Sequence, residues 1–176
     1  MLTTVIYAQY SMNFNGDMIH LPIGSDFDSG KDEYTISNYI KFDNYNSKQT
    51  WFSFVGAGVI NICWRHNQCG VGNNNMSYWT SGNWSCTPGA KSDWAVGEWY
   101  HITIVKSYDV FKVYVDGELD VTKSVTPDFT GYYDISLSSG EIFYGNIDHM
   151  AIWNRAFSDQ EVQLNYNTLP NINDED

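Results

Sequence analysis

Residues 99–118 read WYHITIVKSYDVFKVYVDGE and contain two runs of alternating side chains. Apolar side chains occupy every second position of these runs: Tyr100, Ile102 and Ile104, then Phe111, Val113 and Val115. Because successive side chains of a β-strand point to opposite faces, each run is expected to bury one face and expose the other. Asp116-Gly117 suits a tight hairpin turn, since both central residues of such a turn take positive φ. The stretch predicts an antiparallel meander at the centre of an all-β domain.

Similar alternating runs recur along the 176-residue chain, separated by breaks rich in Gly, Asn and Asp. The strands predicted outside the meander are 10–14, 18–21, 34–42, 50–55, 59–64, 76–79, 121–125, 133–137 and 145–153. In the last of these, Ile147 and Ile152 do not share parity, which predicts either a bulge or a strand that is buried on both faces. One short helix is expected after Ser158, a good N-cap with Glu161 at the capping-box spacing. This order predicts two packed antiparallel sheets, a jelly-roll sandwich.

The length suits one domain with a sizeable core, which we place at residues 1–170. Residues 171–176, NINDED, are expected to form an acidic, mobile tail. The net charge of -12 repels nucleic-acid phosphates and anionic membranes, so no nucleic-acid partner is expected. No run approaches the roughly 18 apolar residues of a membrane span, so no membrane insertion is expected. The opening residues, MLTT, show no signal peptide.

The chain contains three cysteines, Cys63, Cys69 and Cys86, all within one stretch rich in Gly, Asn and Trp. An odd number cannot pair completely within one chain. We expect one disulfide, either Cys69–Cys86 or Cys63–Cys69, with one thiol left over; three reduced thiols are the alternative. A zinc site is not expected, because His66 is the only nearby histidine and a second close pair of cysteines is missing.

Residues 65–94 break the strand pattern. A long irregular segment inside a compact domain is usually functional or disordered, and the aromatic content of this one argues against disorder. Sugars lay their apolar C–H faces on aromatic rings, while amides and guanidinium groups bond their hydroxyls. The predicted glycan-binding residues are Trp64, Arg65, His66, Asn73, Asn74, Asn75, Tyr78, Trp79 and Trp84. The alternative is that some of these tryptophans pack in the core, as expected for Trp99 and Trp153.

Four motifs follow one another in a characteristic order. They are FNG at 14–16, GEWYHI at 97–102, VYVDG at 113–117, and a final run from GNID at 145–148 to IWNRAFSDQEV at 152–162. Through them, residues 10–167 resemble the laminin-G-like, concanavalin A-like lectin superfamily. The resemblance implies the two-sheet jelly roll. It is less specific for function, because that fold hosts lectins, adhesion modules and enzymes.

The resemblance also implies a structural calcium ion between the first turn and the last long strand. Relatives use an Asp of the final strand and backbone carbonyls near the Phe-Asn-Gly motif; here these positions are Asp148, Gly16 and Asp17. Carboxylates and carbonyls are the ligands Ca²⁺ prefers, and a buried carboxylate needs a cation or several donors. The alternative is that Asp148 bonds backbone amides, or pairs with Arg155, without a metal.

Laminarinase-type glycoside hydrolases share the implied fold and carry Glu-x-Asp-x-x-Glu on one strand. Residues 118–123, ELDVTK, begin this way but end in Lys123. A retaining glycosidase needs two carboxyl groups about 5 Å apart, and the lysine removes the second. Glu118 also follows the hairpin turn directly, away from a cleft. The sequence therefore predicts a protein that is not an enzyme, with His101 and His149 in structural roles.

Together these features predict a non-catalytic, lectin-like module that binds a glycan or a cell-surface glycoconjugate. The main alternative is a protein–protein adhesion module, in which the same aromatic side chains form the centre of an interface. A glycoside hydrolase is the least favoured alternative. The predicted location is outside the cell, either secreted or on a virion or cell surface.

Overall fold

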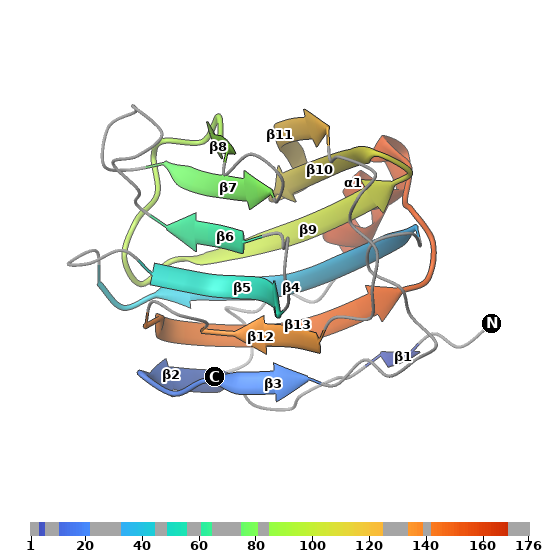
Figure 1. Ribbon diagram of the computed structural model, residues 1–176. Helices are drawn as coiled ribbons and strands as arrows, with labels where there is room; N and C mark the ends of the chain where they lie inside the picture. The colour runs from blue at the N-terminus through green and yellow to red at the C-terminus, as the bar shows by residue number, and fades with distance from the viewer. Residues whose placement is uncertain are drawn as a thin grey trace.

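The computed structural model describes residues 4–5, 11–21, 33–44, 49–55, 61–64, 75–80, 85–124, 134–138 and 142–168. These residues form two antiparallel sheets and one helix, α1 (Asp159–Thr168) (Figure 1). The larger sheet contains β1 (Thr4–Val5), β2 (Met12–Asn15), β4 (Tyr34–Phe42), β9 (Trp99–Ser107), β10 (Val110–Val115), β11 (Glu118–Ser124) and β13 (Tyr144–Trp153). The second sheet contains β3 (Ile19–Leu21), β5 (Gln49–Val55), β6 (Asn61–Trp64), β7 (Met76–Thr80), β8 (Ser85–Pro88) and β12 (Asp134–Leu137).

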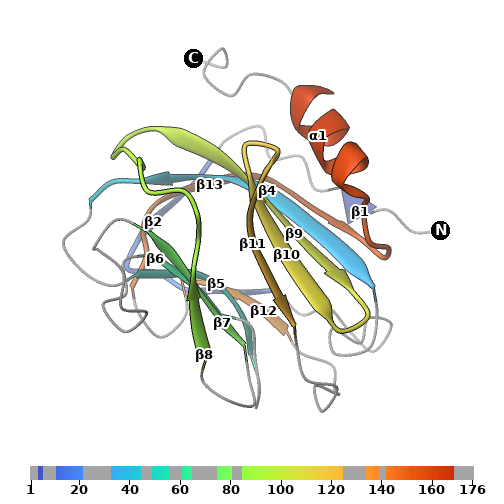
Figure 2. The ribbon, with the colours of Figure 1, turned by 90° about the horizontal axis from the view of Figure 1, so that it is seen from above.

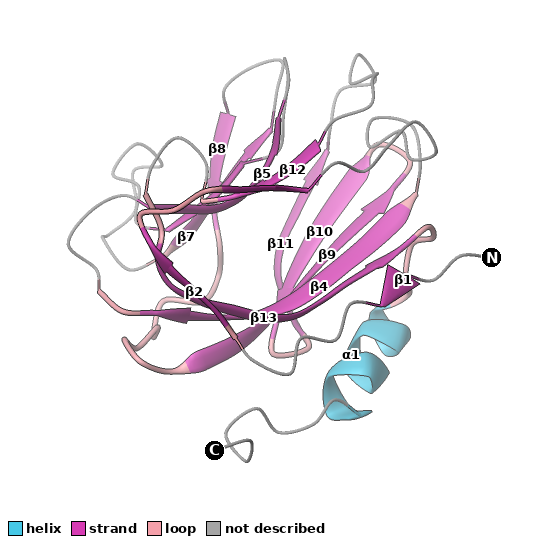
Figure 3. Cartoon of the chain, turned by 90° about the horizontal axis from the view of Figure 1, so that it is seen from below, coloured by secondary structure: helices cyan, strands magenta, loops and turns pink. Residues whose placement is uncertain are grey.

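The two sheets stack face to face, and α1 lies outside them against the larger sheet (Figures 2 and 3). The strand order is β1-β13-β4-β9-β10-β11 in the larger sheet, where β2 also pairs with β13. It is β3-β12-β5-β6-β7-β8 in the second sheet. The predicted meander is β9-β10-β11. This architecture confirms the predicted two-sheet antiparallel sandwich with one short C-terminal helix. Within the described residues, no helix is both long and apolar enough to cross a membrane.

The core lies between the sheets and is built from the inward positions of each strand. On the two central strands of the larger sheet these positions are Tyr34, Ile36, Ile40 and Phe42 of β4, and Tyr100, Ile102 and Ile104 of β9. The second sheet contributes Trp51, Phe52, Met76, Tyr78, Ile135 and Leu137. Side chains of this kind each stabilise the fold by roughly 1.5–3 kcal/mol when fully buried. The alternating pattern of the sequence is therefore what selects the inward faces.

Several local predictions are confirmed by the backbone. Asp116 and Gly117 have φ of 51° and 80°, as the hairpin turn requires. The register of β13 against β4 shifts between Asp148 and Ala151, which is the bulge predicted from parity. At the start of α1, the Ser158 amide donates to Glu161 Oε2 (2.8 Å) and the Glu161 amide donates to Ser158 Oγ (3.3 Å), which completes the capping box.

Other details differ from the sequence predictions. The strands β1 and β8 were not predicted, and β11 begins at Glu118 rather than at residue 121. The predicted tail at 171–176 lies outside the described residues.

The prediction that β9 exposes one face is wrong, because α1 covers the outer face. His101, Thr103 and Val105 alternate with the core residues, yet they are only 0–3% exposed. Val162 of α1 packs against Val105 in a second apolar cluster. Tyr166 of α1 stacks on the His101 ring with centroids 5.7 Å apart. The central strand is thus dry on both sides.

This packing sets the protonation state of His101. Its ring also lies 5.0 Å from that of Tyr39, and among the described residues neither ring nitrogen has a hydrogen-bond partner. Burial, with a smaller effect from the nearby His149, lowers the pKa of His101 to about 4. His101 is therefore neutral in the folded protein at neutral pH.

Replacing His101 with Phe keeps a ring at this position and removes the titrating group. An unfolded chain protonates this histidine near pH 6.5, whereas the folded chain does so only near pH 4. The unfolded state binds more protons between these values, so stability is lost as pH falls through this window. We expect the wild type to lose about 3 kcal/mol more than H101F between pH 7 and pH 4. Urea unfolding of both proteins at both pH values measures the difference, and parallel losses would contradict it.

Candidate functional site

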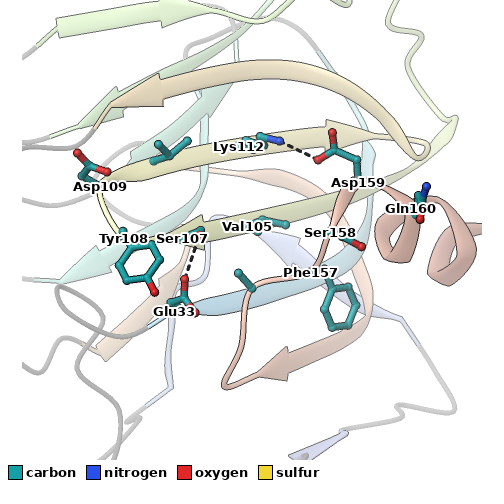
Figure 4. Close-up of a pocket in the computed structure, with 12 residues that line it drawn as sticks. Glu33, Val105, Ser107, Tyr108, Asp109, Lys112, Phe157, Ser158, Asp159 and Gln160 are labelled. Carbon is teal, nitrogen blue, oxygen red and sulfur yellow. Dashed lines mark hydrogen bonds and ion pairs between the residues drawn. The ribbon is translucent and has the colours of Figure 1, made fainter.

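An open groove of about 790 Å³ lies where the β9–β10 hairpin meets the first turn of α1 (Figure 4). Its walls come from three places in the chain: the residue before β4, the hairpin, and the segment that leads into α1. The apolar lining residues are Val105, Val110, Ala156 and Phe157. The charged ones are Glu33, Asp109, Lys112 and Asp159, and the remaining side chains, of Ser107, Tyr108, Ser158 and Gln160, bear a hydroxyl or an amide.

Tyr108 stands at the tip of the hairpin and is 78% exposed, the largest exposure among the large apolar side chains of the described residues. Ser107 and Val110 pair directly, so Tyr108 and Asp109 alone make the turn. Tyr108 has φ of 51°, a region that a bulky residue rarely adopts and that costs on the order of 1 kcal/mol or more. A turn of this kind usually carries Gly, Asn or Asp. The hairpin therefore accepts strain while presenting an aromatic ring to solvent.

Two carboxylates flank this ring. Ser107 Oγ donates a hydrogen bond to Glu33 Oε1 (2.8 Å), which ties the start of β4 to the end of β9. Asp109 follows Tyr108 directly and is exposed. Both side chains lie at the same end of the groove as the Tyr108 ring (Figure 4).

The opposite end of the groove is fixed by Asp159, the first residue of α1. Its Oδ1 accepts hydrogen bonds from Lys112 Nζ (2.7 Å) and from the Tyr114 hydroxyl (2.6 Å). Lys112, with Tyr114 second, lowers the pKa of the Asp159 carboxyl. Burial, and then the bond to Asp159, raises the pKa of Tyr114. The Lys112 ammonium is thus already held by a carboxylate.

The apolar floor is held in place from below. The Phe157 ring packs against Trp153 with centroids 4.7 Å apart, and the Phe157 amide donates to Thr35 Oγ1 (2.9 Å). Arg155 lies over the same ring, 4.5 Å from its centroid, and pairs with Glu161 (2.8 Å). An apolar floor, one exposed ring and a polar rim suit a ligand with an apolar face and hydroxyl groups at its edge.

This groove was not predicted from the sequence, in which a different set of residues was expected to bind the ligand. Most of that set lies outside the described residues: Arg65, His66, Asn73, Asn74 and Trp84. The backbone of Trp64 pairs with Gln49 and Met76, but the Trp64 side chain is also outside the described part. The same holds for Trp79, whose backbone pairs with Asn61 and Cys86. A binding role for the tryptophans stays a prediction.

Tyr78 and Asn75 are the two members of that set whose side chains are described. Tyr78 is fully buried, and its hydroxyl donates to Asp120 Oδ2 (2.5 Å), so its ring is not available to a ligand. Burial, and then the Asp120 charge, raises the pKa of Tyr78. Asn75 Nδ2 donates to the Gly89 carbonyl (2.9 Å). The run MSYWT has aromatic side chains on adjacent positions, which left the inward face of β7 undetermined.

The residues that resemble a hydrolase motif have structural roles. Asp120 is 8% exposed, and besides the Tyr78 hydroxyl it accepts the Lys91 amide (2.6 Å). Lys123 is also buried, and its Nζ donates to the Tyr78 carbonyl (3.3 Å). Glu118 is exposed beside the hairpin turn, as predicted. These contacts join β11 to β7.

Cys86 is one half of a disulfide bond. This is at odds with three reduced thiols and with Cys63–Cys69 as a lone bond, whereas the pairing Cys69–Cys86 stays a prediction.

The predicted calcium ligands are not brought together. Asn15, just before Gly16, pairs with Tyr144 at the start of β13, and Asp148 is four positions further along that strand. This places Gly16 and Asp17 roughly 13 Å or more from Asp148. Two ligands of one Ca²⁺ lie at most about 5 Å apart. The described residues hold no cluster of three or more His, Cys, Asp or Glu suited to a metal.

Asp148 instead has a partner in its own strand. The carboxylate is 5% exposed, and its Oδ1 accepts the His149 amide (2.6 Å) and lies 3.1 Å from His149 Nδ1. His149 itself has a φ of 48° and lies within the bulge of β13. Arg155 pairs with Glu161 rather than with Asp148. The proposed ligand set therefore does not fit one calcium ion.

Thermal unfolding in EGTA and in CaCl₂ tests this reading. Because Asp148 is bonded within its strand, we expect the wild type to have the same Tm in both buffers. Asp148→Asn should lower stability by roughly 1–3 kcal/mol in both, since it weakens a buried hydrogen bond to a charged acceptor. A rise in Tm with calcium that D148N abolishes would restore a metal at this position.

The sequence profile of the concanavalin A-like lectin/glucanases superfamily matches residues 14–163. The chain belongs to this superfamily, in agreement with the sandwich and with the order of its motifs. No curated protein matches the sequence.

Solved structures with a similar fold come from several kinds of protein. Domain 4 of AbnA, an extracellular GH43 arabinanase of Geobacillus stearothermophilus solved with arabinotriose, has a TM-score of 0.68 and 21% identity over 91% of this chain and 80% of that one. The botulinum neurotoxin serotype D binding domain has a TM-score of 0.67 and 16% identity, over 89% of this chain and 41% of that one. Trypanosoma rangeli sialidase has a TM-score of 0.69 and 13% identity, over 89% of this chain and 26% of that one. At these identities the similarity shows the fold alone, and this chain spans less than half of the toxin and sialidase chains.

Proposed function

We propose that this protein is a non-catalytic carbohydrate-binding module that holds a glycan in the groove between the β9–β10 hairpin and α1. The observation that carries the proposal is Tyr108, a ring that is 78% exposed at the rim and held at positive φ. Strained residues persist where the surrounding structure fixes them, and they concentrate at functional sites. An exposed aromatic ring above an apolar floor is the surface on which a sugar stacks.

The polar rim supplies the second half of recognition. A pyranose or furanose ring that lies on Tyr108 turns its hydroxyl groups outward, toward the carboxylates of Glu33 and Asp109. Gln160, at the start of α1, offers an amide on the other wall, while the Ser158 hydroxyl there is held by the capping box. Carboxylates accept hydrogen bonds from sugar hydroxyls, while the amide both donates and accepts. Binding by this arrangement needs neither a nucleophile nor a general acid.

Two further points support a binding role over catalysis. The carboxylate of Asp120, in the segment that resembles a hydrolase motif, is buried in bonds to Tyr78 and Lys91. The similar structures include an arabinanase domain solved with arabinotriose and a toxin binding domain. By analogy, we place this protein outside the cell with a glycan or glycoconjugate as its partner. The predicted tryptophan segment at 65–94 would add a second contact surface.

A glycan array followed by calorimetry tests the site. We expect Tyr108→Ala to weaken binding of the best glycan by about tenfold, because a stacked aromatic ring is worth roughly 1 kcal/mol or more. Tyr108→Phe keeps the ring and should retain most of the affinity. Leu119→Ala removes another exposed apolar side chain, 48% exposed and outside the groove, and should have no effect.

Other outcomes have clear meanings. If W79A or W84A abolishes glycan binding and Y108A leaves it intact, the binding site lies in the tryptophan segment rather than in the groove. Failure to bind any glycan, together with capture of a defined protein ligand, would replace the proposal with an adhesion module. Release of reducing sugar from a polysaccharide panel would contradict the non-catalytic role.

A further inference from the structure

The charged side chains of the groove do not balance one another. Glu33, Asp109 and Asp159 bring three carboxylates, and Lys112 brings one ammonium group. Lys112 Nζ lies 2.7 Å from Asp159 Oδ1, so this pair is neutral as seen by a ligand. Glu33 and Asp109 remain, and both lie at the Tyr108 end of the groove (Figure 4).

Other cations near the groove are already engaged. Arg155 lies outside its lining, pairs with Glu161 (2.8 Å) and covers the Phe157 ring. Among the described residues, the side chain that bonds Glu33 is the uncharged Ser107 hydroxyl (2.8 Å). The Tyr108 ring therefore has a carboxylate on each side, and the whole chain adds a field from its net charge of -12.

We propose that this groove selects glycans that carry a protonated amine, such as de-N-acetylated hexosamines, and excludes uronic, sialylated or sulfated glycans. The inference rests on the proposed function, because it assigns a ligand class to the same site. A cation above an aromatic face is attracted by the ring quadrupole, and the two carboxylates add direct attraction. An anionic sugar at the same position meets like charges, and the described lining residues offer it no unpaired cation.

The first test is an array that presents free-amine, neutral and anionic sugars in three groups. Hits concentrated among free amines support the inference. Neutral sugars bound as tightly as their amine counterparts, or any anionic hit that Tyr108→Ala removes, would overturn it while leaving the glycan-binding role intact. An absence of binding in all three groups would remove both proposals together.

The second test separates local charge from overall charge. The double variant Glu33→Gln with Asp109→Asn removes the two groove carboxylates, and we expect it to weaken binding of the best amine-bearing glycan about tenfold in calorimetry at low salt. Glu98→Gln with Glu118→Gln removes two exposed carboxylates outside the groove, so it changes the net charge equally, and it should change affinity by less than about twofold. Equal losses in the two double variants would show that the groove itself does not select the amine.

Discussion

The docking of one short helix on the outer face of the larger sheet is the contact on which the remaining features depend. Val162 packs against Val105, and Tyr166 covers His101, so the outer face of β9 is dry over its central part. The same docking brings Asp159 against Lys112 at the other end of the helix. The helix is too short to be stable by itself, since isolated helices below about 12–15 residues are marginal in water. Packing on the sheet therefore holds the helix in place, and the helix in turn forms one wall of the groove.

Local patterns in the sequence predicted most of the helix and strand positions, although β1 and β8 were missed. Alternation predicted the meander, Asp116-Gly117 predicted its turn, parity predicted the bulge in β13, and Ser158 with Glu161 predicted the helix start. Each of these signals acts between residues that are near in the chain. The groove was not visible because Glu33, Tyr108 and Asp159 meet only after three distant segments pack together. The inward face of β7 could not be predicted either, since Tyr78 and Trp79 are adjacent aromatics and alternation does not show which of them points inward.

The carboxylates of this acidic protein separate into two groups by environment. Asp120 and Asp148 are buried and satisfied by hydrogen bonds from neighbouring amides, and from the Tyr78 hydroxyl in the case of Asp120. Asp120 stabilises β11, and Asp148 stabilises the bulge of β13. These structural roles account for both carboxylates without a role in ligand binding or catalysis. Glu33 and Asp109 lie instead on the open groove. Asp148, which suggested a metal, and Asp120, which suggested a hydrolase, thus have structural roles. The groove residues that are available to a ligand belong to no recognisable sequence motif.

The turn that carries Tyr108 has a further consequence for recognition. Because Ser107 and Val110 pair directly, the loop has only two residues and no slack, and the Ser107 side chain is tied to Glu33. The aromatic platform on this hairpin is therefore preorganised: the hairpin need not be ordered when a guest binds, so its share of the entropy lost on association is that of a few side-chain rotamers. Such a surface favours rapid, reversible capture over slow induced closure. Modules of this kind gain strength by being repeated or tethered, so that many brief contacts add up to durable attachment.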